Sequence, residues 1–137
     1  MAREHFDERG LLKSNRLRNF EKLMDEVRRV DDQAVVYSDV LDYVDRENEI
    51  AQGLELERKL LRKFRRGHDP LGNVLKTSLL PYQVRGAIFT SCRGRVVLAD
   101  DMGLGKTVQA LAATELLRRR RGIRRVLVVA PASVKYQ

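Results

Sequence analysis

The chain has 137 residues, of which 43% are hydrophobic, and it carries a net charge of +8 at neutral pH. This length allows one ordinary domain with a core and is too short for a two-lobed motor. A single cysteine, Cys92, excludes an intramolecular disulfide and a cysteine-based metal site, which suits a reducing compartment. No apolar run reaches membrane-spanning length and no secretory signal opens the chain. We therefore expect no membrane partner and a cytoplasmic location, or a nuclear one if the source is eukaryotic.

Residues 1–70 are predicted to form a helical amino-terminal extension. Apolar residues recur every three or four positions from Leu17 to Val30, which predicts an amphipathic helix that Asp31 interrupts. Ser38 could cap a short second helix, although residues 34–40 could instead form a strand. Residues 54–64 suggest a third helix. The glycines and the proline between residues 67 and 72 then predict a turn and a domain boundary near residue 70.

Residues 95–112 contain a glycine loop between two predicted elements. Residues 96–99 are continuously apolar and β-branched at their start, as in a buried parallel strand. Gly103 and Gly105 permit positive φ in the turn that follows. Apolar residues at helical spacing come next, and they place Gln109 off the apolar face. The stretch therefore predicts a strand, a glycine loop and a helix.

The chemistry of this glycine loop favours phosphate, because backbone N–H groups and the positive end of a helix dipole converge there. Lys106 can reach β- and γ-phosphate oxygens, and the Thr107 hydroxyl can ligate Mg²⁺. The chain matches the second half of the pattern GxxxxGK[ST], with Asp100 at the place of the first glycine. The alternative is an ordinary turn with a solvated lysine, which leaves Gly105 and Thr107 unexplained.

Two flanking segments add candidate contacts. Gln83 follows Pro81 at the start of a predicted helix, and its planar carboxamide could pair with adenine N6 and N7, or could simply face solvent. Residues 125–130 predict a second buried strand, which Pro131 ends. Ser133 and Lys135 would then lie on a loop at the strand's carboxyl end, where they could contact nucleic-acid phosphate.

The excess positive charge lies in the same region. Residues 1–80 hold 16 basic and 16 acidic residues, whereas residues 81–137 hold 11 basic and 3 acidic ones. The arginines at positions 118–121, 124 and 125 cluster at the end of the predicted helix. A solvated helix end explains this cluster best, because cations favour that end of the dipole. DNA contact is the alternative, although no aromatic residues interleave with the arginines.

The segment LADDMGLGKT, residues 98–107, resembles motif I of the Swi/Snf-related, helicase-like ATPases of superfamily two. In that family a glutamate is usual at the place of Asp101, and the first glycine of the general pattern is also missing. LLPYQVRGA resembles the family's Pro-Tyr-Gln segment, whose glutamine reads adenine. RVLVVAPASVKYQ resembles motif Ia, which touches the nucleic-acid backbone. The three motifs occur in the family's order and cover about the last sixty residues.

The resemblance implies an α/β fold, namely an incomplete P-loop (RecA-like) parallel-sheet lobe preceded by the helical extension. Residues 71–137 would be the amino-terminal part of a helicase ATP-binding domain, truncated after motif Ia. The implied cofactors are ATP and Mg²⁺, and the implied partner is double-stranded DNA, bound through the complete motor. The expected nucleotide-binding residues are Gln83, Asp101, Met102, Gly103, Leu104, Gly105, Lys106 and Thr107, with Lys106 and Thr107 also catalytic.

Hydrolysis in this family also needs a later acidic motif and arginines from a second lobe. Neither follows in this sequence, so we expect the 137-residue chain to bind ATP without turning it over. The first hypothesis is a fragment of an ATP-driven DNA translocase. The second is a stand-alone nucleotide-binding or regulatory module.

Overall fold

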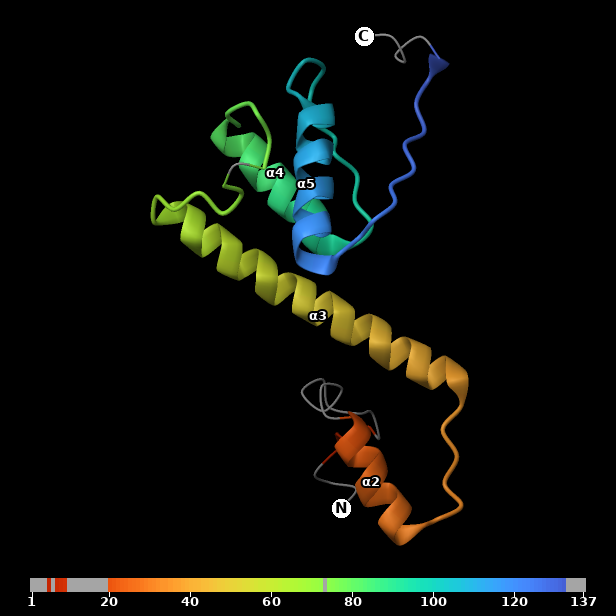
Figure 1. Ribbon diagram of the computed structural model, residues 1–137. Coiled ribbons are helices and arrows are strands. Elements are labelled where there is room, and N and C mark those ends of the chain that lie inside the picture. Colours follow the sequence, from red (N-terminus) through yellow and green to blue (C-terminus); the bar gives the residue numbers. More distant parts are fainter. Residues whose placement is uncertain (1–4, 6, 10–19, 73, 133–137) are drawn as a thin grey trace. The chain divides into compact units, whose positions relative to one another are not determined.

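The computed structural model describes His5, residues 7–9, 20–72 and 74–132 (Figure 1). Its helices are α2 (Phe20–Val30), α3 (Ser38–Arg65), α4 (Pro81–Arg93) and α5 (Lys106–Arg121). The chain divides into two compact units, Met1–Gly53 and Leu54–Gln137. Among the described residues, no helix has both the length and the apolar content needed to cross a membrane.

The first unit contains α2 and the first part of α3. Helix α2 confirms the predicted amphipathic helix, and Leu23 is its buried residue; Leu17 lies outside the described residues. The helix ends where predicted, because the Asp31 carboxylate accepts the backbone N–H of Gln33 at 3.0 Å and so favours a turn. The buried His5 ring also lies in this unit, with Nε2 2.8 Å from the Glu26 carboxylate.

Helix α3 runs without a break from Ser38 to Arg65. The prediction of two short helices was therefore wrong, and so was the alternative of a strand at residues 34–40. Gly53 lies inside the helix, where a glycine costs about 1 kcal/mol relative to alanine, and many of its neighbours are charged residues that favour helix. The predicted turn is confirmed, since Gly67 has a φ of 78° and donates its N–H to the Phe64 carbonyl at 3.1 Å.

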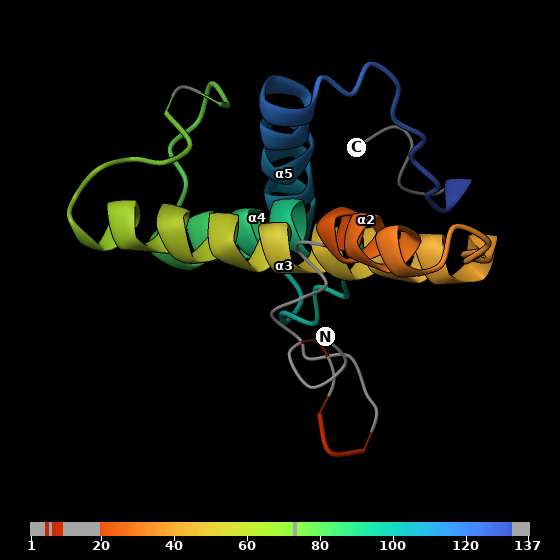
Figure 2. The same ribbon diagram turned by 90° about the horizontal axis from the view of Figure 1, so that it is seen from below.

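The second unit is built around α4 and α5, which cross and pack against one another (Figures 1 and 2). Pro81 opens α4 as predicted, at the first helical position where its missing N–H does no harm. Residues from α3, from the segment between α3 and α4, and from both crossing helices share one core. Its buried members are Leu60, Leu71, Val74, Val84, Ala87, Ile88, Cys92, Ala112 and Leu116.

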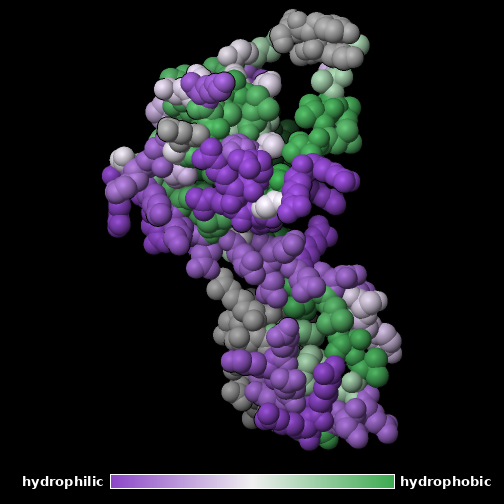
Figure 3. All heavy atoms as spheres, viewed as in Figure 1, coloured by the Kyte–Doolittle hydropathy of each residue, from purple (hydrophilic) through white to green (hydrophobic). Residues whose placement is uncertain are grey.

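The predicted parallel sheet of an α/β P-loop lobe was wrong for the part of the chain that the structure describes, which is helical and contains no strand. The two apolar runs at residues 96–99 and 125–130 are not assigned to any helix or strand and do not bond to one another through their backbones. Val97 is 84% exposed and Leu127 is 89% exposed, and Figure 3 shows hydrophobic atoms on the surface after α5. Apolar β-branched residues favour extended backbone, but a strand also needs a neighbour to accept its hydrogen bonds.

Candidate nucleotide-binding site

The glycine loop lies directly before α5. Gly103 has a φ of 85° and Gly105 a φ of 75°, a backbone region that residues with a Cβ rarely adopt. Gly105 is the N-cap residue of α5, and the first amides of the helix have no acceptor within it. A Cβ on Gly105 would also lie 2.6 Å from Gln83 Nε2. The positive φ therefore favours glycine at this position, and a Cβ there would also require the end of the flexible Gln83 side chain to shift.

Lys106 is the first residue of α5, and its side chain folds back over the loop. Its ammonium donates to the backbone carbonyl of Asp100 at 2.6 Å and to that of Asp101 at 2.9 Å. An ammonium has three donor hydrogens, so one remains for a ligand. The loop thus presents a positive charge beside the unbonded amides of a helix N-terminus, which is a combination that attracts anions.

Thr107 and Met102 both face solvent. Thr107 is exposed at the first turn of α5, and the Met102 side chain is 95% exposed. No group of three His, Cys, Asp or Glu residues in the described part of the chain could hold a metal ion. Mg²⁺ commonly binds through one or two protein oxygens together with substrate phosphates and water. The accessible Thr107 hydroxyl fits this mode, in which the ion arrives with a phosphorylated ligand.

The start of α4 contacts the loop from the other side. Gln83 Nε2 donates to the Leu104 carbonyl at 3.3 Å, and the Tyr82 hydroxyl donates to the same oxygen at 3.1 Å. Gln83 Oε1 accepts the Leu80 N–H at 3.0 Å, which satisfies a free amide at the start of the helix. The structure therefore brings Gln83 beside the loop, and it adds Tyr82, which the sequence analysis did not single out.

Gln109 is buried, contrary to the prediction from the sequence. The helical period placed it off the apolar face, but its side chain is only 1% exposed. Its Nε2 donates to the Asp100 carboxylate at 2.6 Å. A Cβ built on Gly86 of α4 would lie 1.8 Å from Gln109 Oε1. The glycine at position 86 was the available signal, because a helical glycine often marks a close approach of a neighbouring element.

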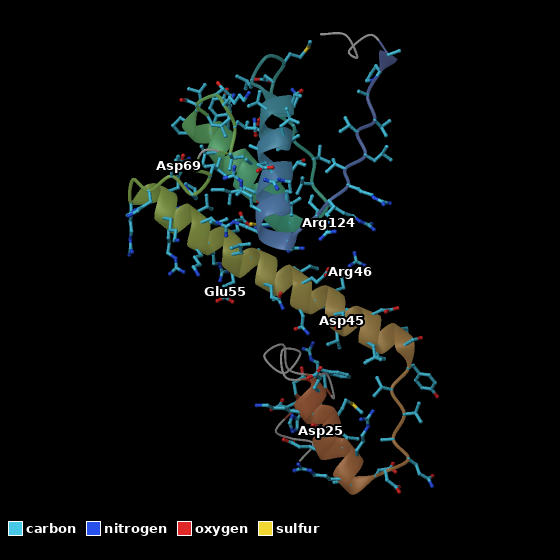
Figure 4. All side chains as sticks on the ribbon, viewed as in Figure 1. Asp25, Asp45, Arg46, Glu55, Asp69 and Arg124 are labelled. Carbon is cyan, nitrogen blue, oxygen red and sulfur yellow. The ribbon has the colours of Figure 1, made fainter. Side chains whose placement is uncertain are left out.

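The basic end of α5 is partly neutralised by Glu115. Arg118 donates to this carboxylate at 2.6 and 2.7 Å and Arg119 at 2.7 Å, and these hydrogen bonds, that of Arg118 first, lower the pKa of Glu115 to about 2. The same contact raises the pKa of Arg118. Figure 4 shows Arg124 just beyond the helix. The pairing fits a solvated helix end. Ser133 and Lys135, the predicted nucleic-acid contacts, lie outside the described residues.

A family model described as the SNF2-related domain matches residues 15–137. The chain is 48% identical over 63 residues to the SWI/SNF-related matrix-associated actin-dependent regulator of chromatin subfamily A-like protein 1 of Bos taurus. This match covers 45% of this chain and 6% of that protein. It is 42% identical over 69 residues to the DNA annealing helicase and endonuclease ZRANB3 of Mus musculus, which covers 50% of this chain and 6% of that protein. The chain therefore spans only a small part of these relatives. No solved structure matches it.

Proposed function

Because the chain belongs to the SNF2-related domain family, which is the family that its motifs resemble, we propose that it binds ATP as part of a DNA-dependent ATPase motor. The printed names of its relatives, a regulator of chromatin and a DNA annealing helicase, support DNA as the partner of the whole motor. We further propose that residues 71–137 contribute to the ATP-binding domain and residues 1–70 form its helical extension. The proposed DNA partner implies that the protein is located with the DNA, which in a eukaryote means the nucleus.

The observation that carries this proposal is the geometry around Lys106. The ammonium is already held at the loop by two carbonyls, beside the free amides that begin α5. When the β- and γ-phosphates of ATP enter the loop, Lys106 supplies a compact charge and the amides supply neutral donors. Asp101, Met102 and Leu104 contribute through the backbone of the loop, since Asp101 and Met102 precede Gly103 and Leu104 lies between Gly103 and Gly105.

Gln83 is proposed to read the adenine base. One lone pair of Oε1 holds the Leu80 N–H and one hydrogen of Nε2 points to the Leu104 carbonyl. The other hydrogen of Nε2 points to the Tyr82 hydroxyl at 3.4 Å, a long hydrogen bond. The carboxamide therefore retains one acceptor site, and it can donate to adenine N7 by exchanging its bond to Tyr82. Adenine offers the complementary pair, the N6 amino group and the N7 acceptor. Thr107 would hold Mg²⁺, which would neutralise phosphate charge.

Calorimetric titration of the chain with ATP and Mg²⁺ tests the binding proposal. A hydrogen bond to a charged group contributes about 1.5 to 3 kcal/mol, so Lys106→Ala should weaken ATP binding by roughly ten- to a hundredfold. Lys59→Ala is the matched control, because Lys59 is exposed on α3 and its loss removes the same charge away from the loop. Equal weakening in both variants would show that overall charge, and not Lys106, attracts the nucleotide.

Turnover is proposed to require residues beyond these. The loop can position ATP and Mg²⁺, but the attacking water and the developing γ-phosphate charge need the later acidic motif and arginines of the motor. The 137-residue chain should therefore release no phosphate above background, with or without duplex DNA. Release that depends on DNA and disappears in Lys106→Ala would contradict this expectation.

A further inference from the structure

Gln109 joins three parts of the proposed nucleotide site. It projects from α5, its amide nitrogen holds the Asp100 carboxylate at the start of the loop, and its amide oxygen lies against Gly86 of α4. Asp100 in turn accepts the Lys106 ammonium through its backbone carbonyl. The buried side chain of Gln109 therefore connects three parts of the site: helix α5, which begins at Lys106, Asp100, which accepts a hydrogen bond from Lys106, and helix α4, which carries Gln83.

The polar side chain of Gln109 differs from one that only fills space in the core. A buried carboxamide costs free energy unless its polar atoms are bonded, and an apolar side chain of the same size would fill the space without that cost. The hydrogen bond goes to a carboxylate at only 2.6 Å, which places it among the stronger, charge-assisted ones. Such a bond fixes the direction of Asp100 as well as its distance.

Helix α4 has a second attachment to the same loop. Tyr82 and Gln83 donate to the Leu104 carbonyl, and they lie about one helical turn before Gly86. The approach at Gly86 is so close that no Cβ fits there unless Gln109 moves. The start of α4, where Gln83 is proposed to read adenine, is thus fixed relative to the glycine loop at two points, the Leu104 carbonyl and Gly86.

We propose that Gln109 is a positioning residue for ATP binding, which sets the Asp100 end of the loop against α4 so that Lys106 and Gln83 engage one nucleotide together. This inference rests on the proposed function. Gln109 itself does not touch the ligand. It acts through Asp100, which holds Lys106, and through Gly86, which fixes the distance to the helix of Gln83.

A double-mutant cycle on ATP affinity tests the proposal. Gln109→Met keeps the length of the side chain without its hydrogen bond, and Asp100→Ala removes the acceptor. Asp100→Asn keeps an acceptor and is the conservative variant. Gln52→Met is the matched control, because Gln52 is exposed on α3. Calorimetry gives the ATP affinity of each variant at a temperature at which circular dichroism shows all of them folded.

Gln109→Met and Asp100→Ala should each weaken ATP binding by about tenfold, the loss expected when 1.4 kcal/mol of binding free energy is removed. The double variant should bind ATP as tightly as the single variant with the lower ATP affinity, because both changes break the same hydrogen bond. Asp100→Asn should recover most of the affinity lost in Asp100→Ala. If Gln109→Met does not fold, the Asn and Ala variants at position 100 still decide the matter.

Three outcomes would overturn the inference alone: unchanged ATP affinity in Gln109→Met, effects of the two single changes that multiply in the double variant, or equal affinities of the Asn and Ala variants. Absence of ATP binding by the unsubstituted chain would instead overturn the proposed function, and this inference with it.

Discussion

Replacing Gly86 by alanine should destabilise the second unit, although the change improves helix propensity. Alanine is favoured over glycine inside a helix by about 1 kcal/mol. Against this gain, the new Cβ would lie 1.8 Å from Gln109 Oε1 and 2.8 Å from Gln109 Cδ. Gln109 is fully buried, so it can move only by giving up its bond to Asp100, at a cost of about 1.5 to 3 kcal/mol. We expect a net loss of about 0.5 to 2 kcal/mol in the free energy of unfolding.

Urea unfolding of the chain, followed by circular dichroism, measures this loss as a lower midpoint at unchanged slope. The control is the same substitution in a Gln109→Ala background, in which the obstructing side chain is absent. There Gly86→Ala should stabilise the chain by up to about 1 kcal/mol, because only the helix propensity remains. Stabilisation in both backgrounds would refute the reasoning, since it would show that α4 and α5 do not meet at Gly86 and Gln109.

Three further predictions concern single side chains. Burial raises the pKa of the Cys92 thiol, which is 4% exposed, so a thiol reagent should label the native chain slowly and the urea-unfolded chain fast; equal rates would contradict the packing of α4. The pKa of Glu115 falls from 4.5 to about 2 on folding, so its stabilising effect is complete above pH 4.5 and is lost as the pH falls toward 2. Melting temperatures should therefore fall less steeply with acid in Glu115→Gln, and parallel curves would exclude the ion pairs. Gln83→Ala should reduce the preference for ATP over GTP by about 1 to 3 kcal/mol in competition titrations; an unchanged preference would leave Gln83 as a surface residue of α4.

Local signals in the sequence predicted the elements around the site well. Pro81 marks the start of α4, and the glycines at positions 103 and 105 have the positive φ that their turn requires. The family resemblance was confirmed, because the SNF2-related domain model matches residues 15–137. Each of these signals is carried by a short motif, so it needs no knowledge of distant contacts.

Predictions that depended on partners far along the chain were wrong. The runs at 96–99 and 125–130 have strand composition, but composition does not say which segment would accept their hydrogen bonds. Gln109 is polar and was placed off the packed face, whereas Asp100 and Gly86 make its burial favourable. The continuity of α3 was missed because its charged middle has no apolar period to follow. The roles of Ser133 and Lys135 stay predictions.

The central claim is that ATP binds at the loop before α5 and at the start of α4. Hydrogen exchange followed by mass spectrometry, with and without ATP and Mg²⁺, tests it most directly because it locates the ligand along the chain. We predict slower amide exchange in peptides that cover residues 100–109 and 80–86, and unchanged exchange in peptides of α2. Bound ATP that leaves exchange in residues 100–109 unaltered would contradict the account.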